Sequence, residues 1–359
     1  MASRVAQPQK SLHGVQILRG VAALAVLLHH VLEESAIFFQ PQTLPEPLVI
    51  AGASGVDLFF VISGFIMLYT CEGRFGQPGA AGDFLLRRLI RIVPLYWLCT
   101  LAVLALALTG AFYKAKIITA GATFNSLFFL PTDHLLLGVG WTLQYEMYFY
   151  LIFAGCLSLG TAGLTIFALP LTLSIMIVIG QFLPAGPAQV FFSNPIALEF
   201  SFGIWLAYLY SRDLLPKINP WLVIFLGCAG IAISAIFAPS DGTSGLAPQL
   251  RFLAWGVPAL MIVYAGLSVG RVSSRAGRLL PLLGNASYSI YLTHAIVMTS
   301  YAKLIKTESF SHYLPPLAWM AVAVAVALAI GIATYKLVEQ PANNWLKSRW
   351  RAQGGAVAA

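Results

Sequence analysis

Long apolar runs recur along almost the whole chain, and they predict its architecture. A helix needs about 20 apolar residues to cross a bilayer. Ten runs approach that length, near 15–33, 54–72, 92–110, 138–158, 162–180, 191–210, 220–237, 250–269, 285–304 and 315–336. The pattern therefore predicts an all-α, polytopic integral membrane protein with about ten transmembrane helices. Thr123–Leu130 is a candidate short re-entrant piece.

Composition places the chain in the same class. It is 59% hydrophobic and only 9% charged, whereas soluble domains carry about 25% charged residues. The ten spans leave little length for a soluble module, so residues 1–359 are predicted to form one transmembrane domain. Residues 1–14 would be a short cytoplasmic lead and residues 338–359 a cytoplasmic tail.

The net charge of +8 follows from topology. With a cytoplasmic N-terminus, ten spans return the C-terminus to the same side. The inner segments then hold most of the lysines and arginines, as the positive-inside rule expects. Nucleic acid is therefore not needed as a partner. The four cysteines show no CxxC spacing, so neither a disulfide framework nor a metal site is predicted.

The first apolar run contains an arginine and a histidine in register. Ten residues separate Arg19 from His30, which places them on nearly the same helix face, about 16 Å apart. Ionisable groups inside a membrane helix are costly and by default mark a functional site. His29, directly before His30, leaves open which imidazole acts.

Polar side chains also interrupt other spans. Asp57 and Ser63 lie in GVDLFFVISGF, and Glu146 lies among aromatic residues that include Trp141. Tight helix packing is the simpler explanation for the small residues, but a buried carboxylate needs a partner. We expect Glu146 to orient His30, as carboxylates orient histidine bases in hydrolases. Glu199 is a second carboxylate of this kind.

Two further groups carry candidate chemistry. Arg87, Arg88 and Arg91 precede an apolar run; they are either a topogenic cluster or an anion site, since guanidinium forks suit phosphates. Tyr288, Tyr291 and His294 form a partly shared polar face. The tyrosines fit an interfacial belt, whereas His294 lies deeper in its span.

These motifs, in this order, resemble acyltransferase family 3, a family of integral membrane proteins. The segments that carry the resemblance are Arg19-x10-His30, GVDLFFVISGF, RRLIRIVPLYW, GWTLQYEMYFY, SYSIYLTH and VEQP. They extend over nearly the whole chain and look most like the branch that acetylates bacterial exopolysaccharide. Many relatives have aspartate where Gln16 stands here.

The resemblance implies an O-acetyltransferase of the bacterial cytoplasmic (inner) membrane. It would transfer acetyl from cytoplasmic acetyl-CoA, a donor substrate and not a resident cofactor, to a sugar hydroxyl of an exopolysaccharide or related glycan. His30 matches the essential histidine and Arg19 its paired arginine. Arg87, Arg88 and Arg91 match the motif linked to the donor. Glu146, Tyr288, Tyr291 and His294 match positions of less settled role, and Asp57, Ser63 and Trp141 are supporting candidates.

The sequence leaves alternatives open. His30 could act as a general base or carry the acyl group itself. The acceptor could be a small hydrophobic molecule or a lipid-linked glycan. A transporter of lipid-linked sugar or of an acyl compound would have a similar composition, and the arginine cluster combined with Arg19-x10-His30 is what favours the enzyme.

Overall fold

The computed structural model describes residues 12–38, 45–109, 118–237, 246, 248–268, 276–307 and 313–352, and every regular element in them is helical. The longer helices are α1 (His13–Phe38), α3 (Gly55–Cys71), α4 (Ala80–Leu108), α6 (Trp141–Leu159), α7 (Ala162–Gln181), α9 (Glu199–Ser211), α10 (Pro220–Ile236), α12 (Gly256–Gly266), α13 (Ala276–Ile305) and α15 (Pro316–Thr334). The shorter ones are α2 (Glu46–Ala51), α5 (Ala120–Leu127), α8 (Pro187–Phe192), α11 (Pro248–Ala254) and α16 (Gln340–Ala352).

The protein is a multi-pass membrane protein. Within the described ranges, seven helical segments are long and apolar enough to cross a membrane: His13–Phe38, Glu46–Arg74, Ala80–Leu108, Ala162–Gln181, Pro187–Ser211, Gln249–Gly266 and Pro316–Trp350. The sequence predicted about ten. Helix α10 is apolar but shorter, while α6 and α13 are long enough but contain many polar residues. A count based on length alone therefore overstates the number of strongly apolar spans, and a cytoplasmic location for both termini stays a prediction.

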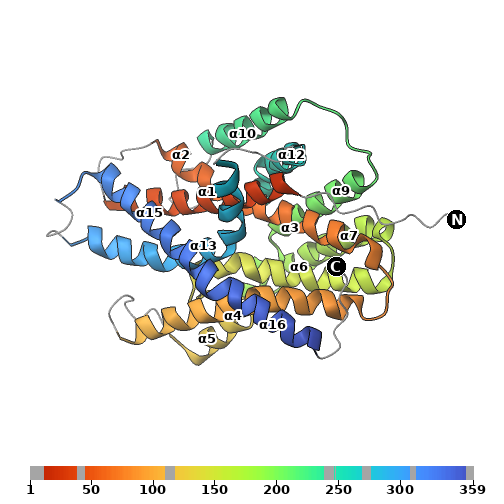
Figure 1. Ribbon diagram of the computed structural model, residues 1–359, viewed down its shortest axis with the longest axis horizontal. Coiled ribbons are helices and arrows are strands. Elements are labelled where there is room, and N and C mark those ends of the chain that lie inside the picture. Colours follow the sequence, from red (N-terminus) through yellow and green to blue (C-terminus); the bar gives the residue numbers. More distant parts are fainter. Residues whose placement is uncertain are drawn as a thin grey trace.

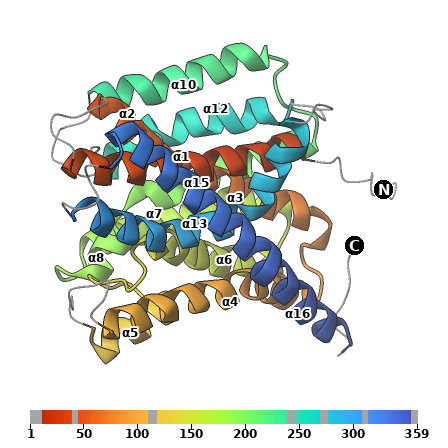
Figure 2. The same ribbon diagram turned by 60° about the vertical axis from the view of Figure 1, so that its left-hand side comes forward.

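The helices are stacked in one bundle (Figures 1 and 2). Helices α10 and α12 lie along one edge and α4 and α5 along the opposite edge, with α1 and α3 between them, and α15 and α16 cross the bundle diagonally. Helices α3 and α9 are in close backbone contact: a Cβ on Gly64 would lie 2.0 Å from the Phe200 carbonyl oxygen, and one on Gly203 2.0 Å from that of Val61. Small residues permit such close helix approach in membranes.

Several boundaries differ from the sequence prediction. Helix α4 begins at Ala80, well before the predicted span at 92, so the three arginines that precede this span are part of the helix. The candidate re-entrant piece largely forms α5, which is bound to α4 through the Tyr96 hydroxyl and the Ser126 carbonyl at 2.8 Å. The predicted tail from 338 contains α16, and residues 1–11 and 353–359 lie outside the described residues.

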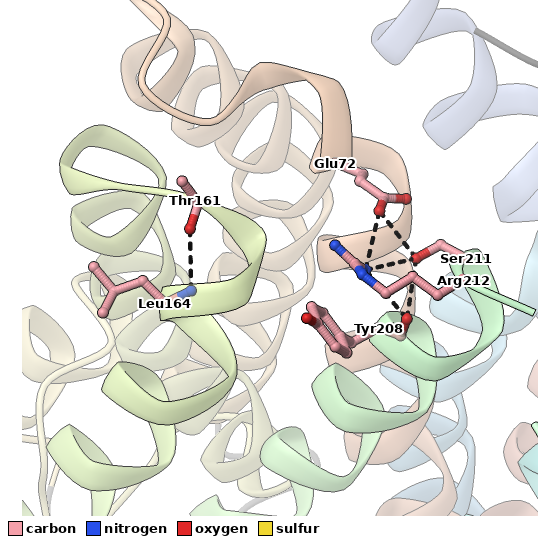
Figure 3. A network of polar contacts seen from close by, with 6 residues as sticks. All are labelled: Glu72, Thr161, Leu164, Tyr208, Ser211 and Arg212. Carbon is pink, nitrogen blue, oxygen red and sulfur yellow. Dashed lines mark hydrogen bonds and ion pairs between the residues drawn. The ribbon is translucent and has the colours of Figure 1, made fainter. Parts of the chain in front are cut away.

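A polar network joins the ends of α3 and α9 (Figure 3). Glu72, just after α3, accepts hydrogen bonds from Ser211 Oγ at 3.1 Å and from Arg212 Nη1 at 3.2 Å. The Arg212 guanidinium also lies 3.6 Å from the Tyr208 ring centroid. Nearby, Thr161 caps α7 by accepting a hydrogen bond from the Leu164 amide. These contacts fix the end of the bundle from which the chain enters α4.

Candidate active site

A cavity lies in the middle of the bundle between α1, α3, α4, α6 and α13. It holds about 740 Å³ of empty space, its open mouth included. Four charged side chains line it: Arg19, Arg88, Arg91 and Glu146. Apolar residues of α3 make up much of the rest of the wall.

The charged lining of the cavity favours an anion. Glu146 is its single lining carboxylate, and it accepts hydrogen bonds from Ser63 Oγ at 3.0 Å and from the Tyr150 hydroxyl. Three guanidinium groups face this one carboxylate. Arg88 Nε is buried and has no hydrogen-bond partner among the described residues. Because an unpaired buried donor is costly, an anionic ligand would complete this site.

Arg87 stands apart from the other two arginines of the motif. Its Nη2 lies 3.0 Å from Asp83 Oδ2, an oxygen that also pairs with Arg74. Its guanidinium lies 5.4 Å from the Trp350 ring centroid on α16. The sequence grouped Arg87, Arg88 and Arg91, whereas the structure directs Arg88 and Arg91 into the cavity and ties Arg87 to its own helix.

His30 is not among the residues that line the cavity. Its ring stacks on that of His294 with centroids 5.3 Å apart. The His294 ring is in turn 5.7 Å from that of Tyr291, which lines the cavity. About a third of the His30 side chain is exposed. Three adjoining rings therefore connect the cavity with the histidine that the sequence singled out.

The carboxylate nearest His30 is Glu33, and not Glu146 as we expected. Glu33 Oε2 lies 3.2 Å from His30 Nδ1, whereas Glu146 bonds Ser63 and Tyr150 inside the cavity. The expected hydrogen bond between Glu146 and His30 is absent from the described structure. Residues three apart share a helix face, so the spacing of His30 and Glu33 was a usable signal that the sequence reasoning missed.

His29 differs from His30 in its surroundings. It is buried, and its Nδ1 lies 2.7 Å from the Val49 carbonyl oxygen of α2. Its Nε2 is 3.9 Å from Glu33 Oε2. Ligand atoms of His29, His30 and Glu33 all lie within 4.8 Å of one another and could hold a metal ion. The sequence analysis predicted no metal site because the cysteines lack CxxC spacing. This cluster contains no cysteine, so that argument does not apply to it.

The remaining candidates separate into two groups. Tyr288 and Tyr291 line the cavity and donate to the carbonyls of Ile92 and Val139 at 2.7 and 3.0 Å. His294 is buried with its Nδ1 3.2 Å from the Ile290 carbonyl oxygen, and its Nε2 has no partner among the described residues.

Asp57 and Trp141 are not among the residues that line the cavity. Asp57 forms a buried ion pair with Arg251, whose Nη2 lies 2.9 Å from Asp57 Oδ2. Trp141 packs edge-on against Phe60. The sequence analysis did not pair Arg251 with Asp57; the unmatched carboxylate at the start of α3 was the available signal for this pairing.

Comparison with known proteins identifies the family. A family model described as an acyltransferase domain, acyltransferase 3, matches residues 12–336. The chain belongs to this family. The exopolysaccharide production protein ExoZ of Rhizobium meliloti (strain 1021) is 34% identical over an alignment of 312 residues that covers 81% of this chain and 89% of ExoZ. The resemblance seen in the motifs is confirmed, and the protein is a membrane acyltransferase.

More distant relatives agree with this assignment. A putative acetyltransferase of Acidianus two-tailed virus is 26% identical over an alignment of 288 residues that covers 78% of this chain and 81% of that protein. The O-acetyltransferase OatA of Staphylococcus aureus (strain NCTC 8325 / PS 47) is 25% identical over 366 residues; the alignment covers 92% of this chain and 57% of OatA. No solved structure matches the chain.

Proposed function

We propose that this acyltransferase transfers an acetyl group from cytoplasmic acetyl-CoA to a sugar hydroxyl of an exopolysaccharide or related cell-surface glycan. One observation carries the proposal: a cavity has three guanidinium groups and Tyr291 in its wall, the Tyr291 ring contacts that of His294, and the His294 ring stacks on that of His30. A phosphate-rich thioester donor and an imidazole base are the two components that such a transfer needs. The relationship to ExoZ and OatA supports the acceptor class and the acetyl group.

The cavity suits the donor. Its lining on α6 extends from Thr142 to Tyr150, which is about 12 Å of helix. At the Tyr150 end, the Arg88 guanidinium lies 6.0 Å from the Tyr150 ring centroid. At the Thr142 end, the Tyr291 hydroxyl lies 2.9 Å from the Thr142 hydroxyl. Phosphates of CoA would bind Arg88, Arg91 and Arg19, and the pantetheine arm would bring the thioester toward Tyr291. Phosphate–guanidinium pairs are strong and directional.

His30 would act as the general base. Its Nδ1 faces Glu33, so Nε2 is the nitrogen available to an acceptor. Nε2 takes the proton of the sugar hydroxyl while the oxygen attacks the thioester carbonyl carbon. The C–S bond then breaks, so the acetyl group stays on the sugar oxygen and the CoA thiolate leaves. The imidazolium proton passes to the CoA sulfur. Such base assistance typically accelerates a reaction by about 10²–10⁴-fold. Tyr291 and His294 have to turn aside for the thioester to arrive.

A reconstituted transfer assay tests the proposal. The purified protein in liposomes is given acetyl-CoA with a labelled acetyl group and the glycan of its own host, and label on the glycan is measured. We expect His30→Ala to lower transfer by about 10²–10⁴-fold. His134, an exposed residue outside the site, provides the matched control, and His134→Ala should transfer at the wild-type rate. Full activity of folded His30→Ala would overturn the proposal.

Mass spectrometry of the glycan identifies the acceptor. Cells without the gene should lose acetyl groups from their surface glycan, and the wild-type gene should restore them. Movement of a lipid-linked sugar across the liposome membrane without covalent label on any product would instead assign the protein to transport and refute the transferase. We expect transfer only when labelled acetyl-CoA is supplied on the face of the protein that is cytoplasmic in the cell. That result would place the arginine-lined end of the cavity at the cytoplasmic face of the bacterial inner membrane.

A further inference from the structure

We propose that Glu33 is the positioning residue of His30, accepting the Nδ1 proton so that Nε2 is presented to the acceptor hydroxyl. The inference rests on the proposed function, in which His30 is the base. It is carried by geometry: Glu33 Oε2 lies 3.2 Å from His30 Nδ1, and both side chains come from the same face of α1. A rigid helix fixes the pair without help from a loop.

The contact selects one tautomer of His30. A carboxylate oxygen can only accept a hydrogen bond, so the pairing places the proton on Nδ1 and leaves the lone pair on Nε2. The same carboxylate stabilises the imidazolium that forms when Nε2 takes a proton. A carboxylate in this position therefore orients the ring and also favours the proton transfer itself.

Glu33 also separates the roles of the neighbouring imidazoles. The Nδ1 atoms of His29 and His294 face backbone carbonyls, those of Val49 and Ile290. A neutral carbonyl fixes a tautomer but stabilises an imidazolium less than a full negative charge does. Among the three histidines, His30 has the carboxylate hydrogen bond, which answers the question that the adjacent pair of histidines raised.

The other charged groups around the pair leave Glu33 as the main influence. His29 lies on α1 and His294 on α13, and both are buried. Arg251 of α11 is committed to Asp57 in a buried ion pair. Glu34 interacts more with Lys306 than with His30. Because the Glu33 side chain is 37% exposed, solvent screens its charge, and we expect a moderate effect of Glu33 on His30.

Three variants test the inference. Glu33→Gln keeps the size of the side chain but removes its charge, Glu33→Asp keeps the charge on a shorter stem, and Glu34→Gln is the matched control on the neighbouring glutamate. We expect Glu33→Gln to lower kcat about tenfold, a part of what a general base supplies, with little change in the KM for acetyl-CoA. Glu33→Asp should recover part of the loss, and Glu34→Gln should behave as wild type.

The split between kcat and KM distinguishes positioning from a merely structural role. A variant that only loses folded protein would give a lower total rate, but its kcat per folded molecule would equal that of the wild type. An unchanged kcat per folded molecule in Glu33→Gln would overturn the inference while leaving the transferase intact.

A readout that needs no acyl acceptor separates the two proposals. Diethyl pyrocarbonate acylates neutral imidazoles, and peptide mass spectrometry locates the modification on His30. A carboxylate on Nδ1 makes Nε2 a better nucleophile, so the modification of His30 at one fixed pH should be slower in Glu33→Gln, even in a protein without transferase activity. Loss of wild-type activity with EDTA and recovery with Zn²⁺ would assign His29, His30 and Glu33 to a metal ion and overturn the positioning role.

Discussion

The buried ion pair between Asp57 and Arg251 is predicted to hold α3 and α11 together. Arg251 reaches the carboxylate with two atoms, Nε at 3.2 Å and Nη2 at 2.9 Å. Its Nη2 also donates to the Ala53 carbonyl, and its guanidinium lies 4.7 Å from the Trp255 ring centroid. Asp57 is fully buried and Arg251 is 7% exposed. We expect Asp57→Asn to destabilise the protein strongly.

The magnitude follows from what remains after the substitution. A neutral amide in place of the Asp57 carboxylate would remove the charge that pairs with the buried Arg251 cation, and loss of one partner of a buried pair typically costs about 3–5 kcal/mol. Arg251→Met should cost a similar amount, because it leaves the Asp57 carboxylate unpaired. The double variant Asp57→Asn/Arg251→Met leaves neither charge behind, so its cost should be well below the sum of the two single costs.

Unfolding in mixed micelles measures these differences. The tryptophan fluorescence of detergent-solubilised protein is followed as the fraction of sodium dodecyl sulfate rises, for wild type, both single variants and the double variant. The half-exposed pair of Glu72 and Arg212 is the matched control, and Glu72→Gln should cost at most about 1 kcal/mol. An Asp57→Asn protein that keeps wild-type stability but loses acetyl transfer would refute the structural role and return Asp57 to the substrate site.

Two further predictions use contrasts within the structure. Gly64→Ala should lower the free energy of unfolding by several kcal/mol in the same micelle assay, because its Cβ would meet the Phe200 carbonyl oxygen at 2.0 Å. Gly155→Ala is the control: its Cβ would have nothing within 4 Å, so this variant should be neutral or stabilising by up to about 1 kcal/mol. Arg88→Gln should raise the KM for acetyl-CoA about tenfold but leave transfer from the phosphate-free donor S-acetylpantetheine unchanged, and Arg87→Gln should have the smaller effect on KM; equal effects of the two would contradict the division of the arginine motif.

The general class of fold was accessible from the sequence because it depends on local composition. Most ends of helices α1, α7 and α10 lie within a few residues of the ends of the predicted spans 15–33, 162–180 and 220–237. The length of the apolar run alone defines the bounds of these helices. The start of α4 was predicted too late. Its first turns are amphipathic and rich in arginine, and a search for apolar runs does not count such turns.

The candidate site was only partly accessible, for a different physical reason. Residue types and spacing pointed to Arg19, Arg88, Arg91, Glu146 and Tyr291, and all five line one cavity. Which side chain meets which depends on how helices from distant parts of the chain pack. Ser63 and Glu146 are 83 positions apart, and Asp57 and Arg251 are 194 positions apart, so no local pattern encodes either contact.

The exchange of Glu146 for Glu33 as the partner of His30 shows where pattern reasoning failed. A carboxylate among aromatic residues in a span is unusual, and for this reason Glu146, from a distant helix, was expected to be the partner of His30. In the structure that carboxylate faces Arg19, Arg88 and Arg91 in the cavity wall, where a negative charge has its own counter-charges. The histidine, at the other end of the same helix as Arg19, finds its carboxylate one turn further along α1. The first helix thus contributes a cavity-lining cation at one position and, eleven residues later, an imidazole next to its own acid. If the proposed function holds, substitutions at Arg19 should alter the KM for the donor and substitutions at Glu33 should alter kcat.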